Sequence, residues 1–324
     1  MPNWYTSREA VKRAIRSNGN ENDAAIDRLI ESASRDVEQL TKRRFIPKTQ
    51  TRLYRWPSRW AVGDTLWLDE DLISVSTLQS EAQNSSPTTI SSSDYFLEPV
   101  NTAPPYNRIE IDISSDASFS SGDTPQRSIS VAGSWGFSND TESVGTVASG
   151  LAADATATSM VASNGSQISG INVGTASKSE NVTVDSGHGI VAEEVILIDS
   201  EEMFVRVAGT TALTVERAYN GTTLAAHTNN TAVHIFRTLT VTRGVNGTTG
   251  ATHANATAIS VYRAPGPIRQ LVTAMAIAGY TQESAAYGRV LGAGEGATNV
   301  TGRDLDSLAE RVRSEYFRPR EYAI

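Results

Sequence analysis

The sequence holds 324 residues, more than a single hydrophobic core usually contains, so we expect two domains. It contains no cysteine, which excludes a disulfide framework, a thiolate zinc site and a cysteine nucleophile. The net charge of −8 argues against a protein that wraps DNA phosphates, since that task requires a basic surface. No stretch approaches the ~18 consecutive apolar residues of a membrane span, so no membrane contact is expected.

Two helices are predicted at the start of the chain. Thr6 followed by Glu9 has the spacing of a capping box, which predicts a first helix over residues 7–17. A second helix is predicted over residues 22–44, because six apolar residues recur at helical spacing on one face: Ile26, Leu29, Ile30, Ala33, Val37 and Leu40. Basic residues lie at its end, where the helix dipole favours cations.

A run of predicted strands follows these helices. Ile109, Ile111 and Ile113 alternate with polar residues, which is typical of a sheet with one face in water. Strands are expected at residues 49–56, 65–68, 73–79, 95–99, 108–113 and 128–135. We therefore expect a small β-sheet excursion from a helical domain.

The middle of the chain, residues 138–263, is rich in Thr, Ser, Ala, Asn and Gly and contains an internal repeat. Residues 213–237 match residues 239–263, and each copy has the pattern strand, Asn-Gly turn, polar loop, strand. Two more strands are expected before the repeat, at 195–198 and 203–207. The pattern predicts an inserted all-β domain, although residues 140–190 contain too few large apolar groups to indicate a fold.

Helical spacing returns toward the C-terminal end. Pro267 opens a segment with an apolar stripe, which predicts a helix over residues 267–281. A Gly/Ala-rich loop is expected at 284–302, and another helix is expected to begin at Asp304. Residues 317–324 show no period, so we expect an extended tail.

The histidines give a weak metal signal. His227 and His253 occupy equivalent positions in the repeat, but the ligand spacing His-x-x-x-His is absent. We interpret each as fixing a loop by hydrogen bonding in a recurring structural unit. The sequence therefore predicts no metal site and no cofactor.

The densest group of carboxylates consists of Glu193, Glu194, Asp199, Glu201 and Glu202. Two carboxylates can act as acid and base in glycoside hydrolysis, but the tip of a hairpin with exposed acids has the same pattern. We interpret Asp199 and Glu202 as turn residues. No catalytic constellation is found, because there is no Gly-x-Ser-x-Gly elbow and no phosphate-binding loop. We therefore predict that the protein is not an enzyme.

Two short segments resemble a known family. Residues 33–38 with 41–45, ending in Arg44-Phe45, are similar to the long helix of head–tail connector (adaptor) proteins of long-tailed bacteriophages. Residues 133–137, Gly-Ser-Trp-Gly-Phe, resemble the element that closes the strand excursion in that family. The resemblance covers 1–137 and 264–324. It implies an α+β multidomain fold: an α-helical adaptor core with a small β-sheet excursion, plus an inserted all-β domain, barrel- or sandwich-like.

The resemblance also implies a function. Adaptors of this family form a ring below the portal protein, usually of twelve copies, and extend the channel through which genomic DNA passes without sequence-specific binding. They contact a head-closure, neck or tail protein below. The location implied is the virion neck, after assembly in the host cytoplasm. The C-terminal segment would bind the portal, with interface candidates Arg311, Arg313, Tyr316, Phe317, Arg318, Arg320 and Tyr322. The alternative for this segment is a solvated tail.

Two other functions are compatible with the sequence. The first is carbohydrate or host-surface binding through the β domain, which requires exposed aromatic residues. That domain holds only Phe204, Tyr219, Phe236 and Tyr262 as candidates. The second is degradation of a polysaccharide by Glu201 or Glu202, which requires a carboxyl group with a raised pKa in a deep cleft.

Overall fold

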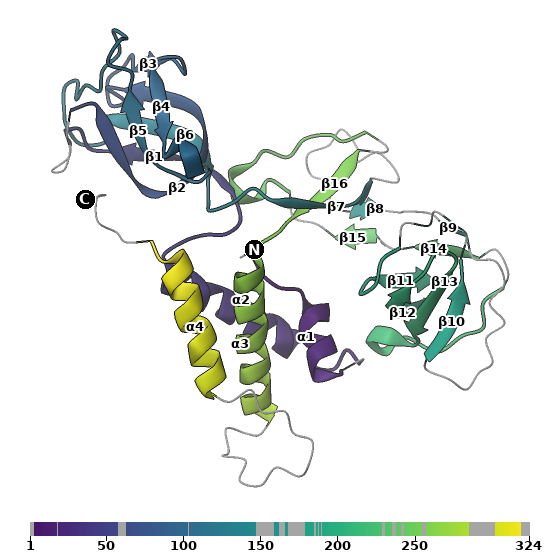
Figure 1. Cartoon of the computed structure of the whole chain (residues 1–324). Coiled ribbons are helices and arrows are strands. Elements are labelled where there is room, and N and C mark those ends of the chain that lie inside the picture. The colour runs from purple at the N-terminus through teal and green to yellow at the C-terminus, as the bar shows by residue number, and fades with distance from the viewer. Residues whose placement is uncertain are drawn as a thin grey trace.

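The computed structural model of the chain contains a helical bundle and two regions of β-sheet (Figure 1). The residues that the structure describes are 3–17, 19–57, 63–102, 104–146, 159–161, 166–167, 179–184, 186, 188, 190–228, 231–234, 238–240, 243–254, 257–284 and 302–318. Most of the remaining positions fall in the predicted insertion and in the segment before the last helix. The prediction for residues 140–190 therefore lies largely outside the described part of the chain.

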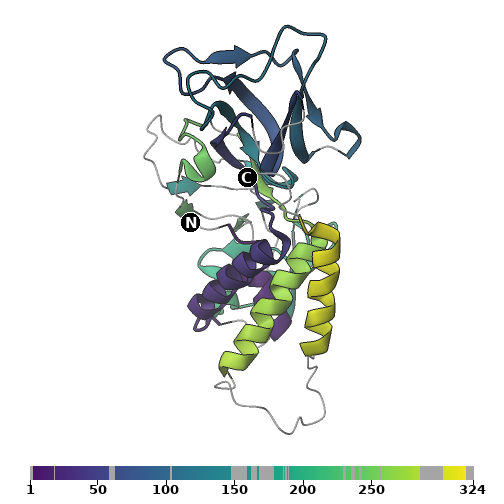
Figure 2. The ribbon, with the colours of Figure 1, turned by 90° about the vertical axis from the view of Figure 1, so that its left-hand side faces the viewer.

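Helices from the two ends of the chain pack into one bundle (Figures 1 and 2). Its members are α1 (Arg8–Ile15), α2 (Asp23–Thr41), α3 (Gly266–Ser284) and α4 (Gly302–Tyr316). Helix α3 contacts each of the other three. Buried side chains from both ends of the chain, among them Phe45, Leu271 and Val312, form a shared core. The N-terminal helices therefore depend on the C-terminal ones for the burial of their apolar faces.

Helix α1 begins one residue later than its capping signal suggested. The hydroxyl of Ser7 accepts a hydrogen bond from the Ala10 N–H at 3.2 Å, so Ser7 is the N-cap. Thr6 instead forms a 2.7 Å hydroxyl–hydroxyl hydrogen bond with Thr273 of α3. The predicted Thr6–Glu9 capping box was therefore wrong, because a tertiary contact takes the threonine that local spacing assigned to the cap.

The first sheet has six strands. They are β1 (Lys48–Tyr54), β2 (Thr65–Ser80), β3 (Thr88–Ile90), β4 (Tyr95–Glu98), β5 (Tyr106–Ile111) and β6 (Ile129–Trp135), with a short helix η1 (Val100–Thr102) before β5. The order is β1-β6-β2-β5-β4, every pairing is antiparallel, and β3 pairs with β2. Strand β2 is long enough to pair with β5 in its first part and with β6 in its second.

This sheet contradicts the predicted architecture of a helical core with a small β-sheet excursion. The described residues contain four α-helices and sixteen strands, so the chain is mostly β. The first sheet has its own core, in which Leu72, Ile109 and Trp135 are fully buried. Residues 65–68 and 73–79 were expected as two strands, but they are parts of β2. The strand passes through Asp69-Glu70-Asp71 because arginines from other elements bind these acids.

The inserted segment leaves and re-enters the chain through two paired strands. Strand β7 (Thr141–Thr146) forms an antiparallel ladder with β16 (Ala258–Tyr262), and Thr141 lies opposite Tyr262. Just beyond the ladder, the Arg263 N–H donates to the Asp140 carbonyl at 2.9 Å. The two ends of the insertion therefore lie together, as insertion of a domain at one connection requires.

Within the insertion lies a second six-stranded sheet. Its strands are β9 (Ser166–Gln167), β10 (Ser179–Thr183), β11 (Val195–Ile198), β12 (Glu201–Ala208), β13 (Ala212–Glu216) and β14 (Ala232–His234), in the order β10-β13-β12-β11-β14-β9. Alternate residues such as Ile196, Val205 and Val215 point into one apolar core. The strand predicted at 195–198 is confirmed, and the one predicted at 203–207 lies within β12. A separate pair joins β8 (Ser159–Val161) to β15 (Thr238–Thr240).

The two copies of the repeat make equivalent turns that contact different parts of the molecule. The turns are η2 (Tyr219–Gly221) and η3 (Val245–Gly247), and each has its central asparagine in the left-handed conformation. Turn η2 lies against α1, where the buried Lys12 ammonium donates to the Asn220 side-chain oxygen at 2.6 Å. Turn η3 lies against β1, and the amide of Asn246 pairs with that of Asn3. The repeat therefore attaches the insertion at two points.

Replacing Gly247 by alanine tests the second attachment point. A Cβ at this position would lie 1.6 Å from the carbonyl oxygen of Thr49, so turn η3 has to move away from β1. We expect a loss of stability of about 1–3 kcal/mol and faster hydrogen exchange in β1. Gly63→Ala is the matched control, because Gly63 also has positive φ but has open space around it. Equal protection of β1 in both variants would contradict this attachment.

Candidate functional site

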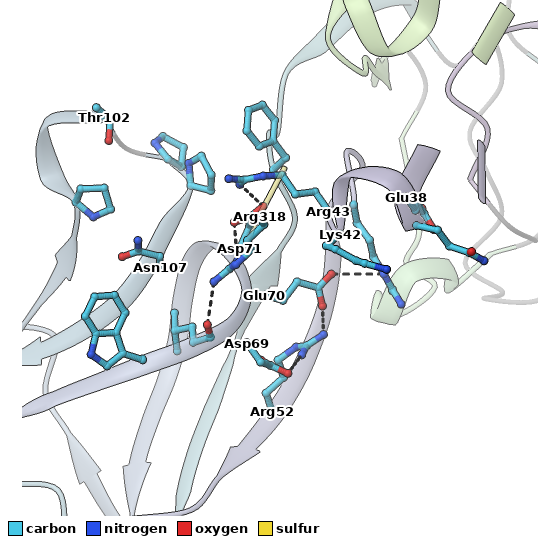
Figure 3. A pocket seen from close by; sticks show the side chains of 18 of the residues that line it. Glu38, Lys42, Arg43, Arg52, Asp69, Glu70, Asp71, Thr102, Asn107 and Arg318 are labelled. Carbon is cyan, nitrogen blue, oxygen red and sulfur yellow. Dashed lines mark hydrogen bonds and ion pairs between the residues drawn. The ribbon is translucent and has the colours of Figure 1, made fainter. Parts of the chain in front are cut away.

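A large cleft lies between the C-terminal end of α2 and the first sheet (Figure 3). Its volume is about 1100 Å³. One side is formed by the last turns of α2 and the residues that follow it. The other side is formed by β2 and by the connection between β4 and β5. The cleft therefore lies where the helical bundle meets the sheet.

Asp71 on β2 holds the two sides of the cleft together. Its carboxylate accepts a hydrogen bond from Arg43 at 2.6 Å and another from Arg318 at 2.6 Å (Figure 3). Arg43 follows α2 and Arg318 follows α4, so one carboxylate joins the sheet to two helices. Asp71 is only 3% exposed, and in that environment a charge requires such partners.

Arg318 is the most deeply placed of the basic residues in the cleft. Its guanidinium also donates to the Leu68 carbonyl at 2.8 Å, and its backbone N–H donates to the Thr41 carbonyl at 2.9 Å. Burial lowers the pKa of Arg318, and the negative charge of Asp71 opposes that shift. The guanidinium stays charged at physiological pH because arginine is so strongly basic. The chain after α4 is therefore fixed to the sheet at this residue.

Asp69 and Glu70 form a second charged group in the cleft. Arg52 on β1 binds Asp69 at 2.5 Å and also pairs with Glu70 (Figure 3). The hydroxyl of Tyr54 donates to Asp69 at 2.7 Å, and burial together with the Asp69 charge raises the pKa of Tyr54. Arg44 also pairs with Glu70 at 3.4 Å, so two arginines balance the two acids.

The seven residues predicted to bind a portal fall into three groups. Tyr316 and Arg318 are buried inside the molecule, Tyr316 against the rings of Phe45 and Phe137. Arg311, Arg313 and Phe317 are exposed, and Arg313 stacks on the Phe317 ring at 5.7 Å. Arg320 and Tyr322 lie outside the described residues, as does most of the predicted tail at 317–324. The structure thus leaves two of the predicted arginines and Phe317 exposed at the end of α4.

The inserted sheet contains a buried cluster of charged groups. The Glu201 carboxylate is fully buried and accepts hydrogen bonds from Arg217 at 3.0 and 2.5 Å. It also accepts hydrogen bonds from the backbone N–H groups of Ala218 and Ala225, and it lies 3.0 Å from Nε2 of His227. Burial alone would raise the pKa of Glu201, but these hydrogen bonds outweigh that effect and lower it. The other ring nitrogen of His227 lies 2.8 Å from Asp199.

This cluster corrects one interpretation of the acidic group. Glu201 was expected at an exposed hairpin tip but is fully buried, because Arg217, the residue directly after β13, neutralises it. A catalytic acid would need a raised pKa, whereas the pKa of Glu201 is lowered. His227 fixes the loop after β13 by hydrogen bonding, as its place in the repeat predicted. Within the described residues no set of acids and histidines is arranged to hold a metal.

Two of the three described aromatic residues of the insertion are buried. Phe204 and Tyr219 are each 3% exposed and stack on one another with ring centroids 5.3 Å apart. Tyr219 also lies under the Lys12 ammonium at the contact with α1. Tyr262 is 46% exposed, and Phe236 lies outside the described residues. Two of the four candidates for a carbohydrate platform are thus used within the molecule.

Comparison with known proteins found no matching family model, curated protein or solved structure. In the described part of the chain, no helix is both long and apolar enough to cross a membrane.

Proposed function

We propose that the protein is a structural component of a tailed virion: a head–tail adaptor that forms a ring below the portal and extends the DNA channel toward the neck or tail. The observation that carries this proposal is the helical bundle, which is built from both ends of the chain and interrupted by an inserted domain. That is the layout implied by the resemblance of residues 1–137 and 264–324 to adaptors. The large first sheet is an addition to that layout.

Two further features support the proposal. The chain carries a net charge of −8, which suits a channel wall that repels DNA and lets it slide. The end of α4 exposes Arg311, Arg313 and Phe317, and arginine and aromatic residues are enriched at protein interfaces. In a ring, each subunit contacts one neighbour through one surface and the other neighbour through a different surface. Such head-to-tail contacts give a closed ring when the rotation between subunits closes.

The alternative function, binding of carbohydrate or a host surface through the β domain, has weaker support. Stacking on a sugar requires an exposed aromatic ring, and Phe204 and Tyr219 are buried. Degradation of a polysaccharide by Glu201 is disfavoured by the ion pair with Arg217. The adaptor proposal requires neither an exposed aromatic platform nor a catalytic acid.

Reversing the charge at the end of α4 tests the portal contact. In the double variant Arg311→Glu, Arg313→Glu we expect affinity for the portal to fall about tenfold or more, because truncation of arginine anchors typically costs 1–2 kcal/mol or more. Co-sedimentation or interferometry with purified portal measures the effect. The control is Arg55→Glu, Arg127→Glu, which makes the same charge change at two other exposed arginines. Unchanged affinity in the first variant would remove α4 from the portal interface.

A further inference from the structure

The cleft beside α2 has more basic groups than its own acids neutralise. Six basic and four acidic side chains line it, whereas the whole chain has a net charge of −8. One positive charge of this excess lies deep in the cleft, where Arg43 and Arg318 share Asp71. The other lies nearer the opening, among residues at the end of α2.

Lys42 and Arg44 are the two exposed basic side chains of the cleft. Lys42 is exposed directly after α2 and, among the described residues, forms no hydrogen bond or ion pair. Arg44 reaches Glu70 through Nε at 3.4 Å, and 47% of its side chain is exposed. Both side chains can therefore receive an acidic group without breaking a strong internal contact. Figure 3 shows Lys42 on the helix side of the cleft, opposite Asn107 and Thr102.

The opposite wall of the cleft combines an apolar surface with two polar side chains. The apolar part is formed by Trp67 on β2 and by three prolines, Pro99, Pro104 and Pro105, in the connection from β4 to β5, and the polar side chains are those of Thr102 and Asn107. Prolines have no N–H group and a fixed φ, so they present a preformed apolar surface. The volume of about 1100 Å³ lies at the upper end of the range of about 300–1,000 Å³ typical of sites for small molecules, so the cleft has room for several residues of an extended chain. This combination suits a length of polypeptide.

We propose that this cleft binds an extended acidic segment of another protein chain. Carboxylates of the segment would pair with Lys42 and Arg44, and its apolar side chains would pack on Trp67 and the prolines. Recognition of acidic motifs by clustered basic residues is a recurring mode of peptide binding. Double-stranded DNA suits the cleft less well, because its regularly spaced phosphates require a continuous basic surface, whereas the basic residues of the cleft are interspersed with carboxylates.

Binding of peptide pools to the full-length protein tests this proposal. The probe is a fluorescein-labelled pool of peptides of about twelve residues, rich in Asp, Glu, Leu and Pro. A matched pool carries Asn and Gln in place of the acids. We expect the acidic pool to bind at least about tenfold more tightly than the amide pool, with an affinity that falls as salt is added.

Lys42→Glu should reduce binding of the acidic pool about tenfold, and Arg55→Glu, which makes the same charge change outside the cleft, should not. Equal binding of the two pools would overturn the proposal, as would equal loss in the two variants. Tighter binding of a short DNA duplex, abolished by Lys42→Glu, would make the cleft a nucleic-acid site instead. These measurements use the protein in solution and do not depend on ring formation.

Discussion

Replacing Asp71 by asparagine should destabilise the protein by about 3–5 kcal/mol, because two guanidinium groups, those of Arg43 and Arg318, would lose their shared counter-charge in a buried position. The substitution keeps the size of the side chain, so the loss of stability is due to the missing charge and not to a cavity. The expected result is a lower urea midpoint for the bundle and the first sheet. Near-ultraviolet circular dichroism gives a second signal, because the Arg43 guanidinium lies over the Phe137 ring at 5.2 Å.

Asp69→Asn is the control for this prediction. Asp69 lies two residues away on the same strand and pairs with Arg52, but 41% of its side chain is exposed. An exposed ion pair contributes about 0–1 kcal/mol, so this variant should remain close to the native protein. If the two variants lost the same stability, the claim that Asp71 joins the sheet to the helices would be wrong.

Glu201→Gln should have a comparable effect within the inserted domain. The substitution leaves the buried Arg217 without its counter-charge, so we expect a loss of about 3–5 kcal/mol in the unfolding of that domain. Because the pKa of Glu201 is lowered in the folded state, its contribution is present above the ordinary value of 4.5 and is lost as the pH falls below it. The difference in free energy of unfolding between the native protein and the variant should therefore be largest at neutral pH and become smaller in acid.

Urea unfolding of the two proteins at neutral pH and at several acidic values measures this difference. Glu202→Gln is the control, since Glu202 is partly exposed at the same hairpin. A difference that stays constant with pH would contradict the role assigned to the Glu201 charge, and so would an equal loss in Glu202→Gln.

The parts of the fold that the sequence predicted are those with a local signal. Helix α2 has an uninterrupted apolar stripe, and it was expected within three residues of its observed ends, Asp23 and Thr41. Strand β11 was expected at its observed bounds because Val195–Ile198 is apolar and followed by a turn. In both cases the residues that determine the element lie within it.

The parts that were missed depend on partners distant in sequence. Asp69-Glu70-Asp71 has the composition of a turn, and only arginines from other elements allow β2 to pass through it. One of them, Arg318, was assigned to a portal interface because no local pattern indicates a partner 247 positions away. Glu201 was expected to be exposed for the same reason, since Arg217 could not be identified as its partner. Long-range ion pairs leave no periodic pattern in a sequence.

The cleft also could not be predicted from local patterns. Its basic residues lie at the end of a predicted helix, where cations are expected because they interact favourably with the helix dipole, so they do not indicate a binding site. The prolines of its opposite wall lie in the connection between β4 and β5, which composition alone marks as a loop. Only the packing of the bundle against the sheet brings Lys42 to the same cleft as Trp67.

Electron microscopy of the purified protein, alone and mixed with its portal, tests the central proposal most directly. We expect closed rings in which the described helical bundle surrounds a channel, with a count near twelve if the resemblance to adaptors extends to stoichiometry. We also expect these rings to stack on the portal. A particle that stays monomeric at all concentrations and shows no affinity for the portal would contradict the adaptor function.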